Sequence, residues 1–358
     1  MNKLKALIAM SGGVDSSAAA FLMKEQGYEI TGITLKLFDD NISYKKAEKS
    51  CCSLEDVEDA RSIAYKLQIP YYVYNFKDSF DEHVIRRFVS VYESGGTPNP
   101  CIDCNRFIKF DKLIRRAEEL NIDYVVTGHY AVITYDENSG RYLLKKSADR
   151  KKDQSYVLYA MTQKQLSKTL MPLGTLTKDE VRVLAEKHGF INAKKRDSQD
   201  ICFVPDGNYA MFIESYTGKK YCPGSFIDKE GNVLGEHKGI IRYTVGQRKG
   251  LGLSFQQPMY VCKKNPRENT VTLGPKESLF CSSLTASDIN IIPYDTISRP
   301  IHVMAKVRYS QSAEHATAEQ VSADRLHIEF DRPVRAAAKG QAVVLYEDDY
   351  VIGGGTIE

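Results

Sequence analysis

The sequence predicts an α/β domain built on a doubly wound parallel sheet, followed by two small all-β modules. Between residue 4 and about residue 200, apolar strand patterns alternate with amphipathic helix patterns, which is typical of a parallel sheet covered by helices. After about residue 204, helical periodicity stops and short β-rich runs follow one another between turn signals. A chain of 358 residues has room for two or three domains, and we place them at residues 1–204, 205–280 and 281–358.

The first predicted domain begins with a continuous apolar run over residues 4–10, as expected of a strand that is buried on both faces. Its last predicted helix, residues 177–189, begins with Thr-x-x-Glu, which is a capping-box pattern. Between them the sequence predicts helices over 14–26, 53–68, 80–92 and 105–120, and strands over 29–38, 71–75 and 123–127. A ligand of such a sheet would lie at the carboxyl ends of the strands, where residues 11–17 and Gly128 both fall.

The second half of the chain reads as barrels or small sheets, because its β-rich runs are short and separated by turn signals. The strands expected there are residues 239–244, 258–263, 270–273, 301–309, 316–321, 326–330, 342–346 and 351–357. Residues 275–283 are the expected joint between the two β modules.

The composition limits the class of protein. The chain carries 49 Lys and Arg against 46 Asp and Glu, a net charge of +3, which permits a nucleic-acid partner without requiring one. The first residues lack the pattern of a signal peptide and no apolar run approaches a membrane span, so we expect a cytoplasmic protein with no membrane partner. Eight cysteines in such a protein argue for metal or thiol chemistry rather than a disulfide scaffold.

The most informative stretch is Leu-Ile-Ala-Met-Ser-Gly-Gly-Val-Asp-Ser-Ser at residues 7–17, where a strand pattern runs into two glycines and then into an alanine-rich helix pattern. Glycines allow a sharp turn and a close approach of the backbone to a ligand. The following helix points its first N–H groups and the positive end of its dipole at this turn, which suits an anion. The pattern is neither of the two common glycine-rich phosphate motifs. It resembles the PP-loop of enzymes that cleave ATP between the α- and β-phosphates.

Two further stretches carry cysteines. Residues 95–105 read Gly-Gly-Thr-Pro-Asn-Pro-Cys-Ile-Asp-Cys-Asn, so Cys101 and Cys104 stand three apart on a loop that two prolines stiffen. We expect Cys104 to open a helix, where the dipole favours the thiolate and makes it more nucleophilic at neutral pH. Cys202 stands at the end of the first predicted domain, in Asp-Ser-Gln-Asp-Ile-Cys-Phe.

Together these motifs resemble those of the tRNA-specific 2-thiouridylases, which place sulfur on the wobble uridine of certain tRNAs. The resemblance extends over nearly the whole chain, and the motifs follow one another in the family order. They are residues 11–17, 97–105, Thr-Gly-His-Tyr at 127–130, Lys-Asp-Gln-Ser-Tyr at 152–156, 197–203, Tyr-Thr-Val-Gly-Gln-Arg-Lys-Gly at 243–250 and Arg-Tyr at 308–309.

The resemblance implies a role for each matching residue. Cys104 matches the nucleophile of the family and Cys202 its persulfide-bearing cysteine, while Asn99, Pro100 and Cys101 would surround the target base. The residues that would hold ATP are Ala9, Met10, Ser11, Gly12, Gly13, Val14, Asp15, Ser16, Leu35 and Gly128. The residues that would contact tRNA are His129, Lys152, Asp153, Gln154, Arg308, Tyr309 and Gln341.

The implied reaction suits these residue types. ATP would adenylate the C2 oxygen of uridine, and the PP-loop N–H groups and Mg²⁺ would stabilise the departing pyrophosphate; Asp15 is the nearest candidate ligand for Mg²⁺. A sulfur-donor protein would load Cys202 with a persulfide. Either this persulfide attacks C2, or Cys104 releases its outer sulfur and is left in a disulfide with Cys202. The base would leave the anticodon stack, and the basic run at residues 141–152 is a candidate track for the tRNA phosphates.

One position departs from the family pattern, because Cys101 stands where well-known members carry an aspartate. Cys101, Cys104 and Cys202 are therefore candidate ligands of a four-iron iron–sulfur cluster whose open iron would carry hydrosulfide. A zinc site formed by Cys51, Cys52, Cys101 and Cys104 is a rival hypothesis. Two other functions stay open. An amide-forming PP-loop ligase would have no use for the paired cysteines, and the intact Ser-Gly-Gly-Val-Asp-Ser-Ser argues against a tRNA-binding metalloprotein with a degenerate nucleotide site.

Overall fold

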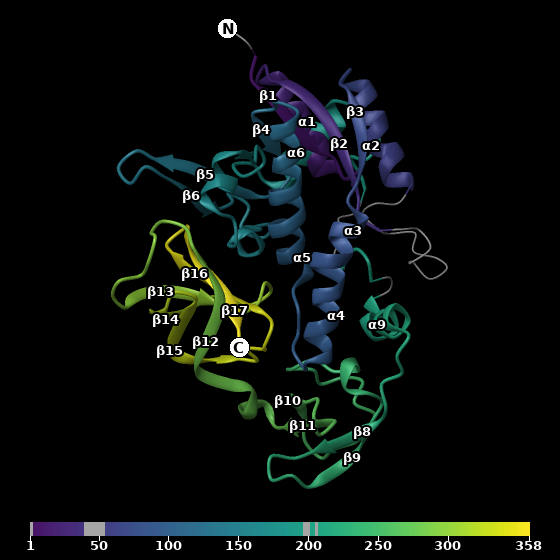
Figure 1. Cartoon of the computed structure of the whole chain (residues 1–358), viewed down its shortest axis with the longest axis vertical. Coiled ribbons are helices and arrows are strands. Elements are labelled where there is room, and N and C mark those ends of the chain that lie inside the picture. The colour runs from purple at the N-terminus through teal and green to yellow at the C-terminus, as the bar shows by residue number, and fades with distance from the viewer. Residues whose placement is uncertain (1–2, 39–53, 196–200, 205–206) are drawn as a thin grey trace. The chain divides into compact units, whose positions relative to one another are not determined.

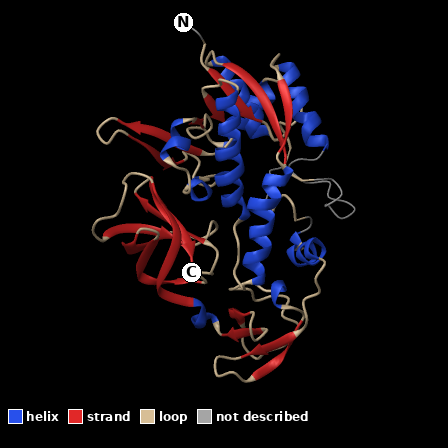
Figure 2. Cartoon of the chain, viewed as in Figure 1, coloured by secondary structure: helices blue, strands red, loops and turns tan. Residues whose placement is uncertain are grey.

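The computed structural model describes residues 3–38, 54–195, 201–204 and 207–358. The chain forms two compact units (Figures 1 and 2). The first comprises residues 1–84, 101–207 and 349–351, and the second comprises residues 85–100, 208–348 and 352–358. Within the described ranges, no helix is both long and apolar enough to cross a membrane.

The first unit is organised around a five-stranded sheet in which all the strands are parallel, as predicted. Its strands are β1 (Lys5–Ala9), β2 (Glu29–Lys36), β3 (Tyr71–Asn75), β4 (Tyr124–Val126) and β7 (Thr169–Leu170). They lie in the order β3-β2-β1-β4-β7, so the chain leaves β1 in one direction for β2 and β3 and later returns to its other side with β4. The strand order therefore reverses at β1, which is where open α/β sheets bind their ligands.

Helices alternate with these strands, which completes the doubly wound pattern (Figure 2). They are α1 (Val14–Glu25), α2 (Leu54–Lys66), α3 (Lys77–Phe80), α5 (Pro100–Asp103), α6 (Leu113–Glu119), α7 (Gln163–Ser167) and α8 (Lys178–Lys187). Two of the predicted helices contain π-helical segments, η1 (Asp81–Ile85) and η2 (Cys104–Lys112), and a 3-10 turn, η3, covers Ser155–Leu158. The predicted capping box of α8 is present, with Thr177 and Glu180 as its two members. The predicted cap at Ser53 lies outside the described residues.

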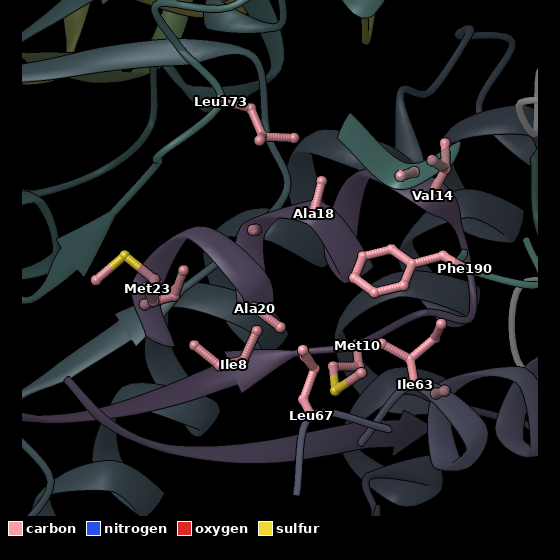
Figure 3. Packing of buried hydrophobic residues seen from close by; sticks show 14 of the residues in the cluster. Ile8, Met10, Val14, Ala18, Ala20, Met23, Ile63, Leu67, Leu173 and Phe190 are labelled. Carbon is pink, nitrogen blue, oxygen red and sulfur yellow. The ribbon is translucent and has the colours of Figure 1, made fainter. Parts of the chain in front are cut away.

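The core of the first unit lies between β1 and the helices that cover one face of the sheet (Figure 3). Ile8 of β1 and Met10, the residue after the end of this strand, pack in one cluster with Ala18 of α1 and Ile63 of α2. Phe190, just after α8, joins the same cluster. The strand is buried along most of its length, as the continuous apolar run predicts.

A hairpin of β5 (Ala131–Asp136) and β6 (Arg141–Lys146) was not predicted from the sequence. Of its residues only Ala131 and Leu144 are buried, so the hairpin lacks the alternation of a half-buried strand pair. The basic run at residues 141–152 therefore begins on a strand.

The second unit contains α4 (Arg86–Glu93), α9 (Tyr209–Thr217) and a small sheet in the order β10-β11-β8-β9. The sheet is formed by β8 (Gly224–Ile227), β9 (Val233–His237), β10 (Tyr260–Asn265) and β11 (Thr270–Gly274). Two predictions are wrong here. Helical structure does not stop at residue 204, because α9 follows, and residues 239–244 are no strand, because Ile240–Arg242 forms a 3-10 turn after Gly239, whose φ is +104°.

The same unit ends in a closed six-stranded barrel in the order β12-β15-β14-β13-β16-β17, with β12 paired to β17. Its strands are β12 (Phe280–Ile291), β13 (Ile301–Lys306), β14 (Glu314–Ser322), β15 (Arg325–Arg335), β16 (Ala342–Glu347) and β17 (Tyr350–Ile357). The sequence did not predict β12, of which only Ala286 is fully buried. Where the barrel closes, a Cβ on Gly353 would lie 2.1 Å from the carbonyl oxygen of Asn290, so glycine permits this pairing.

Candidate active site

The loop between β1 and α1 depends on Gly12. Its φ of +73° lies in the left-handed region that glycine favours. A Cβ at this position would lie 2.4 Å from the backbone carbonyl oxygen of Asp56, so the first turn of α2 packs directly on the loop. Gly13 precedes α1 without any side-chain cap bond. The first N–H groups of α1 are therefore not taken by a capping side chain, as an anion site requires.

Two serine hydroxyls of the motif bond to the loop itself. Ser16 Oγ accepts the Ser11 N–H at 3.1 Å and donates to the Gly13 carbonyl at 3.0 Å, and Ser17 Oγ donates to the same carbonyl at 3.1 Å. Ser16 and Ser17 are buried, whereas Ser11 is exposed. Ser16 and Ser17 thus set the shape of the loop. The N–H groups at the start of α1 and the Ser11 hydroxyl are what the loop presents to an anion.

Side chains that no motif marks support this loop from outside. Asn192, 2% exposed, donates from Nδ2 to the Gly12 carbonyl and to Ser17 Oγ, both at 2.9 Å. Thr34 donates to the Met10 carbonyl at 2.6 Å, next to Leu35, which is buried at the end of β2. Thr34 could have been predicted from its place beside Leu35. Asn192 is far from the loop in the sequence, and no local pattern marks it.

Gly128 follows β4 and reaches the same loop. A Cβ on Gly128 would lie 2.8 Å from the carbonyl carbon of Asp15 and 2.8 Å from the backbone nitrogen of Ser16. Both contacts are with backbone, which cannot swing aside as a flexible side chain would. The structure therefore brings the PP-loop and Gly128 together beside the strand at which the order reverses, in agreement with the sequence-based expectation.

The carboxylate of Asp15, in the first turn of α1, is bound by two side chains. Lys178 Nζ lies 2.8 Å from each of its oxygens, and the Tyr130 hydroxyl donates to one of them at 2.8 Å. The sequence marked Tyr130 only as a member of the motif at residues 127–130, and it did not mark Lys178. Because Lys178 neutralises the Asp15 carboxylate and both of its oxygens already accept hydrogen bonds, this carboxylate is not free to bind Mg²⁺. In the part of the chain that the structure describes, no group of three or more His, Cys, Asp or Glu side chains could hold a metal ion.

The helix that carries Cys101 and Cys104 begins earlier than predicted. α5 starts at Pro100 and continues as η2 from Cys104, so the prediction that Cys104 opens the helix is wrong. The physical reason is that proline suits the first position of a helix, where its missing N–H costs nothing. Cys101 therefore lies nearest the N-terminal end and is exposed, while Cys104 closes the first turn and is 8% exposed. Asn105 stabilises the start of η2, because its Nδ2 donates to the Val157 carbonyl at 3.1 Å.

Cys202 is partly exposed, and Phe203, the residue after it, is held by packing. Phe203 is buried and meets the ring of Phe80 edge-on, with 5.6 Å between the ring centroids. On the other side of the undescribed residues 196–200, Lys195 Nζ lies 2.8 Å from an Asp56 oxygen and 2.6 Å from an Asp59 oxygen. Burial opposes the charged form of Lys195, but these hydrogen bonds raise its pKa. Cys51 and Cys52 lie outside the described residues.

Most of the residues of the first unit that were predicted to contact tRNA form hydrogen bonds with other residues of the same unit. His129 is 8% exposed, with Nδ1 2.8 Å from Thr127 Oγ1, and burial, reinforced by Lys109, holds its pKa well below the usual 6.5. The Asp153 carboxylate accepts from the Ser155 hydroxyl at 2.7 Å. Gln154 Oε1 accepts the Tyr130 N–H at 2.9 Å. Lys152, which is partly exposed, is the one cation of this group.

In the second unit, Arg308 and Gln341 hold backbone segments of the motifs. Arg308 donates from Nε to the Ala336 carbonyl at 3.0 Å and from Nη2 to the Val245 carbonyl at 2.8 Å. Gln341 Nε2 donates to the carbonyls of Thr97 and Pro98 at 2.9 and 3.1 Å, just before Asn99. Tyr309, 44% exposed, is the most accessible of the three predicted residues.

Lys264 of β10, which the sequence did not mark, holds the same loop. Its Nζ donates to the carbonyls of Gly96 and Tyr243 at 3.1 and 2.8 Å and lies 5.4 Å from the centroid of the Tyr92 ring. The residue is 8% exposed, and burial lowers the pKa of its ammonium group to about 8. Lys264 and Gln341 together bind three successive carbonyls ahead of Asn99 and Pro100.

We expect the substitution Lys264→Met to remove a pH dependence of stability above pH 8. Between a folded pKa of about 8 and the unfolded value of 10.5, the unfolded chain binds a proton that the folded chain has lost, so the free energy of unfolding rises with pH. The whole rise amounts to about 3 kcal/mol. Urea unfolding near pH 7.5 and near pH 10 measures it as the difference between wild type and variant. The matched control is Lys263→Met at the exposed neighbouring position, which should run parallel to wild type; a parallel Lys264→Met curve would contradict the prediction.

Comparisons with known proteins agree with this architecture. Family models match residues 4–206 (tRNA methyl transferase HUP domain), 210–275 (tRNA methyl transferase PRC-barrel domain) and 281–357 (aminomethyltransferase beta-barrel domain). A protein from Clostridioides difficile (strain 630), named tRNA-specific 2-thiouridylase MnmA, is 51% identical over 358 residues, which are 100% of this chain and 99% of that protein. The chain belongs to the tRNA-specific 2-thiouridylase family.

Further relatives support the assignment. A protein of the same name from Acetivibrio thermocellus is 50% identical over 359 residues and is covered completely, as is this chain. One solved structure shows a weaker likeness. A 4-thiouridine synthetase–RNA complex with bound ATP is 18% identical with a TM-score of 0.35, over 59% of this chain and 50% of that one, which is too weak a likeness to add to the assignment.

Proposed function

We propose that the protein is a tRNA 2-thiouridylase that uses ATP to activate the wobble uridine and then replaces its C2 oxygen with sulfur. The observation that carries the proposal is the full-length similarity to relatives of that name, at 51% and 50% identity. The matching family models carry methyl transferase or aminomethyltransferase in their names. An intact PP-loop and motif cysteines at Cys104 and Cys202 suit sulfur transfer after ATP cleavage, and this favours thiolation over methylation.

In the activation step, the C2 oxygen of uridine attacks the α-phosphate of ATP, a C2–O–AMP bond forms and pyrophosphate leaves. The chain contributes the N–H groups at the start of α1, which face the phosphates without a competing side-chain cap. Gly128 lets β4 come close to this turn. Mg²⁺ stays part of the proposal as a counter-charge for the phosphates, but because Asp15 is already bound by Lys178 we assign it no step.

In the sulfur step, Cys202 carries a persulfide received from a sulfur-donor protein. Its terminal sulfur attacks C2 and AMP leaves, which links C2 to Cys202 through two sulfurs. The Cys104 thiolate then attacks the Cys202 sulfur, so that 2-thiouridine departs and a Cys104–Cys202 disulfide forms. An external thiol reduces this disulfide for the next turnover. The alternative order, in which Cys104 first releases hydrosulfide from the persulfide and the hydrosulfide attacks C2, has the same balance.

An iron–sulfur cluster at Cys101, Cys104 and Cys202 is the second mechanism that we keep as a hypothesis, because Cys101 is exposed beside Cys104 on one helical turn. The described residues provide no metal-holding group, so we derive no step through a cluster. Anaerobic reconstitution with iron and sulfide should give absorption at about 400 nm that Cys101→Ala removes. A colourless protein with full activity would contradict the cluster hypothesis, and metal analysis would reveal the zinc alternative.

The remaining parts of the proposal concern partners and organisation. tRNA would bind through the partly exposed Lys152 and Tyr309, while His129, Asp153, Gln154, Arg308 and Gln341 shape the surfaces near them. We keep the cytoplasm as the compartment and residues 1–204, 205–280 and 281–358 as the domains.

One assay tests the proposal against its alternatives. The protein is incubated with ATP, a persulfide source and unmodified tRNA, and the nucleosides are analysed by mass spectrometry. We expect one AMP and one pyrophosphate for each 2-thiouridine formed. AMP formation that requires an amine would identify a ligase, and tRNA binding without any ATP cleavage would identify a non-enzymatic binding protein; either result would overturn the proposal.

A further inference from the structure

Lys178 is a buried cation that belongs to the nucleotide site although no motif contains it. Its side chain is 8% exposed, and its Nζ lies 2.8 Å from both oxygens of Asp15. We propose that Lys178 is a positioning residue that neutralises and orients Asp15, so that the PP-loop presents no unbalanced negative charge to the ATP phosphates. The inference rests on the proposed function, because it concerns ATP binding at the same loop.

The backbone of Lys178 is fixed at the first turn of α8. Thr177 caps this helix in a reciprocal capping box with Glu180, and the Asp149 carboxylate accepts the Lys178 N–H at 3.0 Å. These bonds leave the first turn of α8 in one position. The ammonium group is therefore held at Asp15 by the fold and does not reach it by chance from a flexible surface.

The second partner of Asp15 is fixed in a similar way. Tyr130, whose hydroxyl donates to Asp15 at 2.8 Å, is 2% exposed. Its backbone N–H and carbonyl both bond to Gln154, the first through the side chain and the second through the backbone, each at 2.9 Å. Lys178 Nζ also lies 5.9 Å from the centroid of the Tyr130 ring. Asp15 is thus bound from two sides, by Tyr130 after β4 and by Lys178 of α8.

The charge argument follows from the place of Asp15. Its Cα lies in the first turn of α1, so its carboxylate competes with phosphate for the same helix N-terminus. Like charges at such short range repel strongly in a partly buried site. The Lys178 ammonium cancels this repulsion, and removing it would leave beside the phosphates a carboxylate that only the neutral Tyr130 hydroxyl binds.

Calorimetric titration with ATP in EDTA, so that no divalent ion takes part, tests the proposal on four proteins. We expect Lys178→Met to weaken ATP binding about ten- to a hundredfold, because Asp15 then repels the phosphates. Asp15→Asn should tighten binding severalfold, because the Lys178 charge then acts on ATP alone. The double variant should return to within a few fold of wild type. If the pair merely supported the loop, both single variants would weaken binding, and that outcome would overturn the proposal.

Controls separate folding and function from the charge effect. Lys178→Arg keeps the charge and should bind ATP within a few fold of wild type, and Lys187→Met, at the exposed far end of α8, should bind as wild type does. Circular dichroism and thermal unfolding check each variant. Where Lys178→Met does not fold, the sign of the Asp15→Asn effect decides alone: tighter binding supports the proposal and weaker binding overturns it. Wild type that fails to bind ATP would instead contradict the proposed function.

Discussion

Cys104→Ser is expected to abolish 2-thiouridine formation and to leave ATP binding unchanged. Serine has nearly the shape of cysteine, and Cys104 is only 8% exposed, so the helix should keep its packing. The serine hydroxyl is not ionised at neutral pH and does not exchange with a persulfide. We therefore expect the rate of 2-thiouridine formation to fall on the order of a thousandfold or more. The PP-loop lies on different elements, β1 and α1, so it should not sense the change.

The measurement combines nucleoside analysis of the tRNA with calorimetric ATP titration on the same preparation. Cys222→Ser is the matched control, because Cys222 is exposed and belongs to none of the motifs; it should thiolate at the wild-type rate. Thiolation at full rate by Cys104→Ser would show that our assignment of the nucleophile is wrong. Loss of both thiolation and ATP binding would point to a folding defect at η2 instead of to a missing thiolate.

Gly12→Ala should both destabilise the first unit and weaken ATP binding. Alanine at a φ of +73° costs about 1 kcal/mol or more. The new methyl group would also lie 2.4 Å from the Asp56 carbonyl oxygen, and relieving an overlap with backbone costs about 1–3 kcal/mol. We therefore expect the free energy of unfolding to fall by about 2–4 kcal/mol. Because the loop must move away from α2, the affinity for ATP should fall at least about tenfold.

The neighbouring glycine supplies the control. Gly13 has a φ of −87°, which alanine adopts readily, and the nearest atom to an added Cβ is Ser11 Oγ at 3.5 Å. Gly13→Ala should change the free energy of unfolding by less than about 1 kcal/mol, which urea titration measures. Equal losses of stability in the two variants would mean that the contact with Asp56 does not shape the loop.

The parts of the fold that could be predicted are those with a local period. The apolar run of β1, the alternation up to α8 and the capping box at Thr177 each leave a signature within one turn or one strand. β12 was not predicted because only Ala286 on it is fully buried. The hairpin of β5 and β6 was not predicted because each of its strands has a single buried residue. The start of the helix at Pro100 has no distinct signature, because a proline suits both a stiff loop and the first position of a helix.

For the site, the sequence by itself determined the PP-loop, the motif cysteines and the resemblance to the thiouridylases, because each is written in consecutive residues. Only the tertiary structure decided which side chains complete the loop: Lys178 on Asp15, Asn192 on Gly12 and the backbone of Asp56 against Gly12. The reason is physical. Such contacts join residues from separate elements of the parallel sheet and its helices, and their pairing depends on strand order and close approach, which no local pattern encodes.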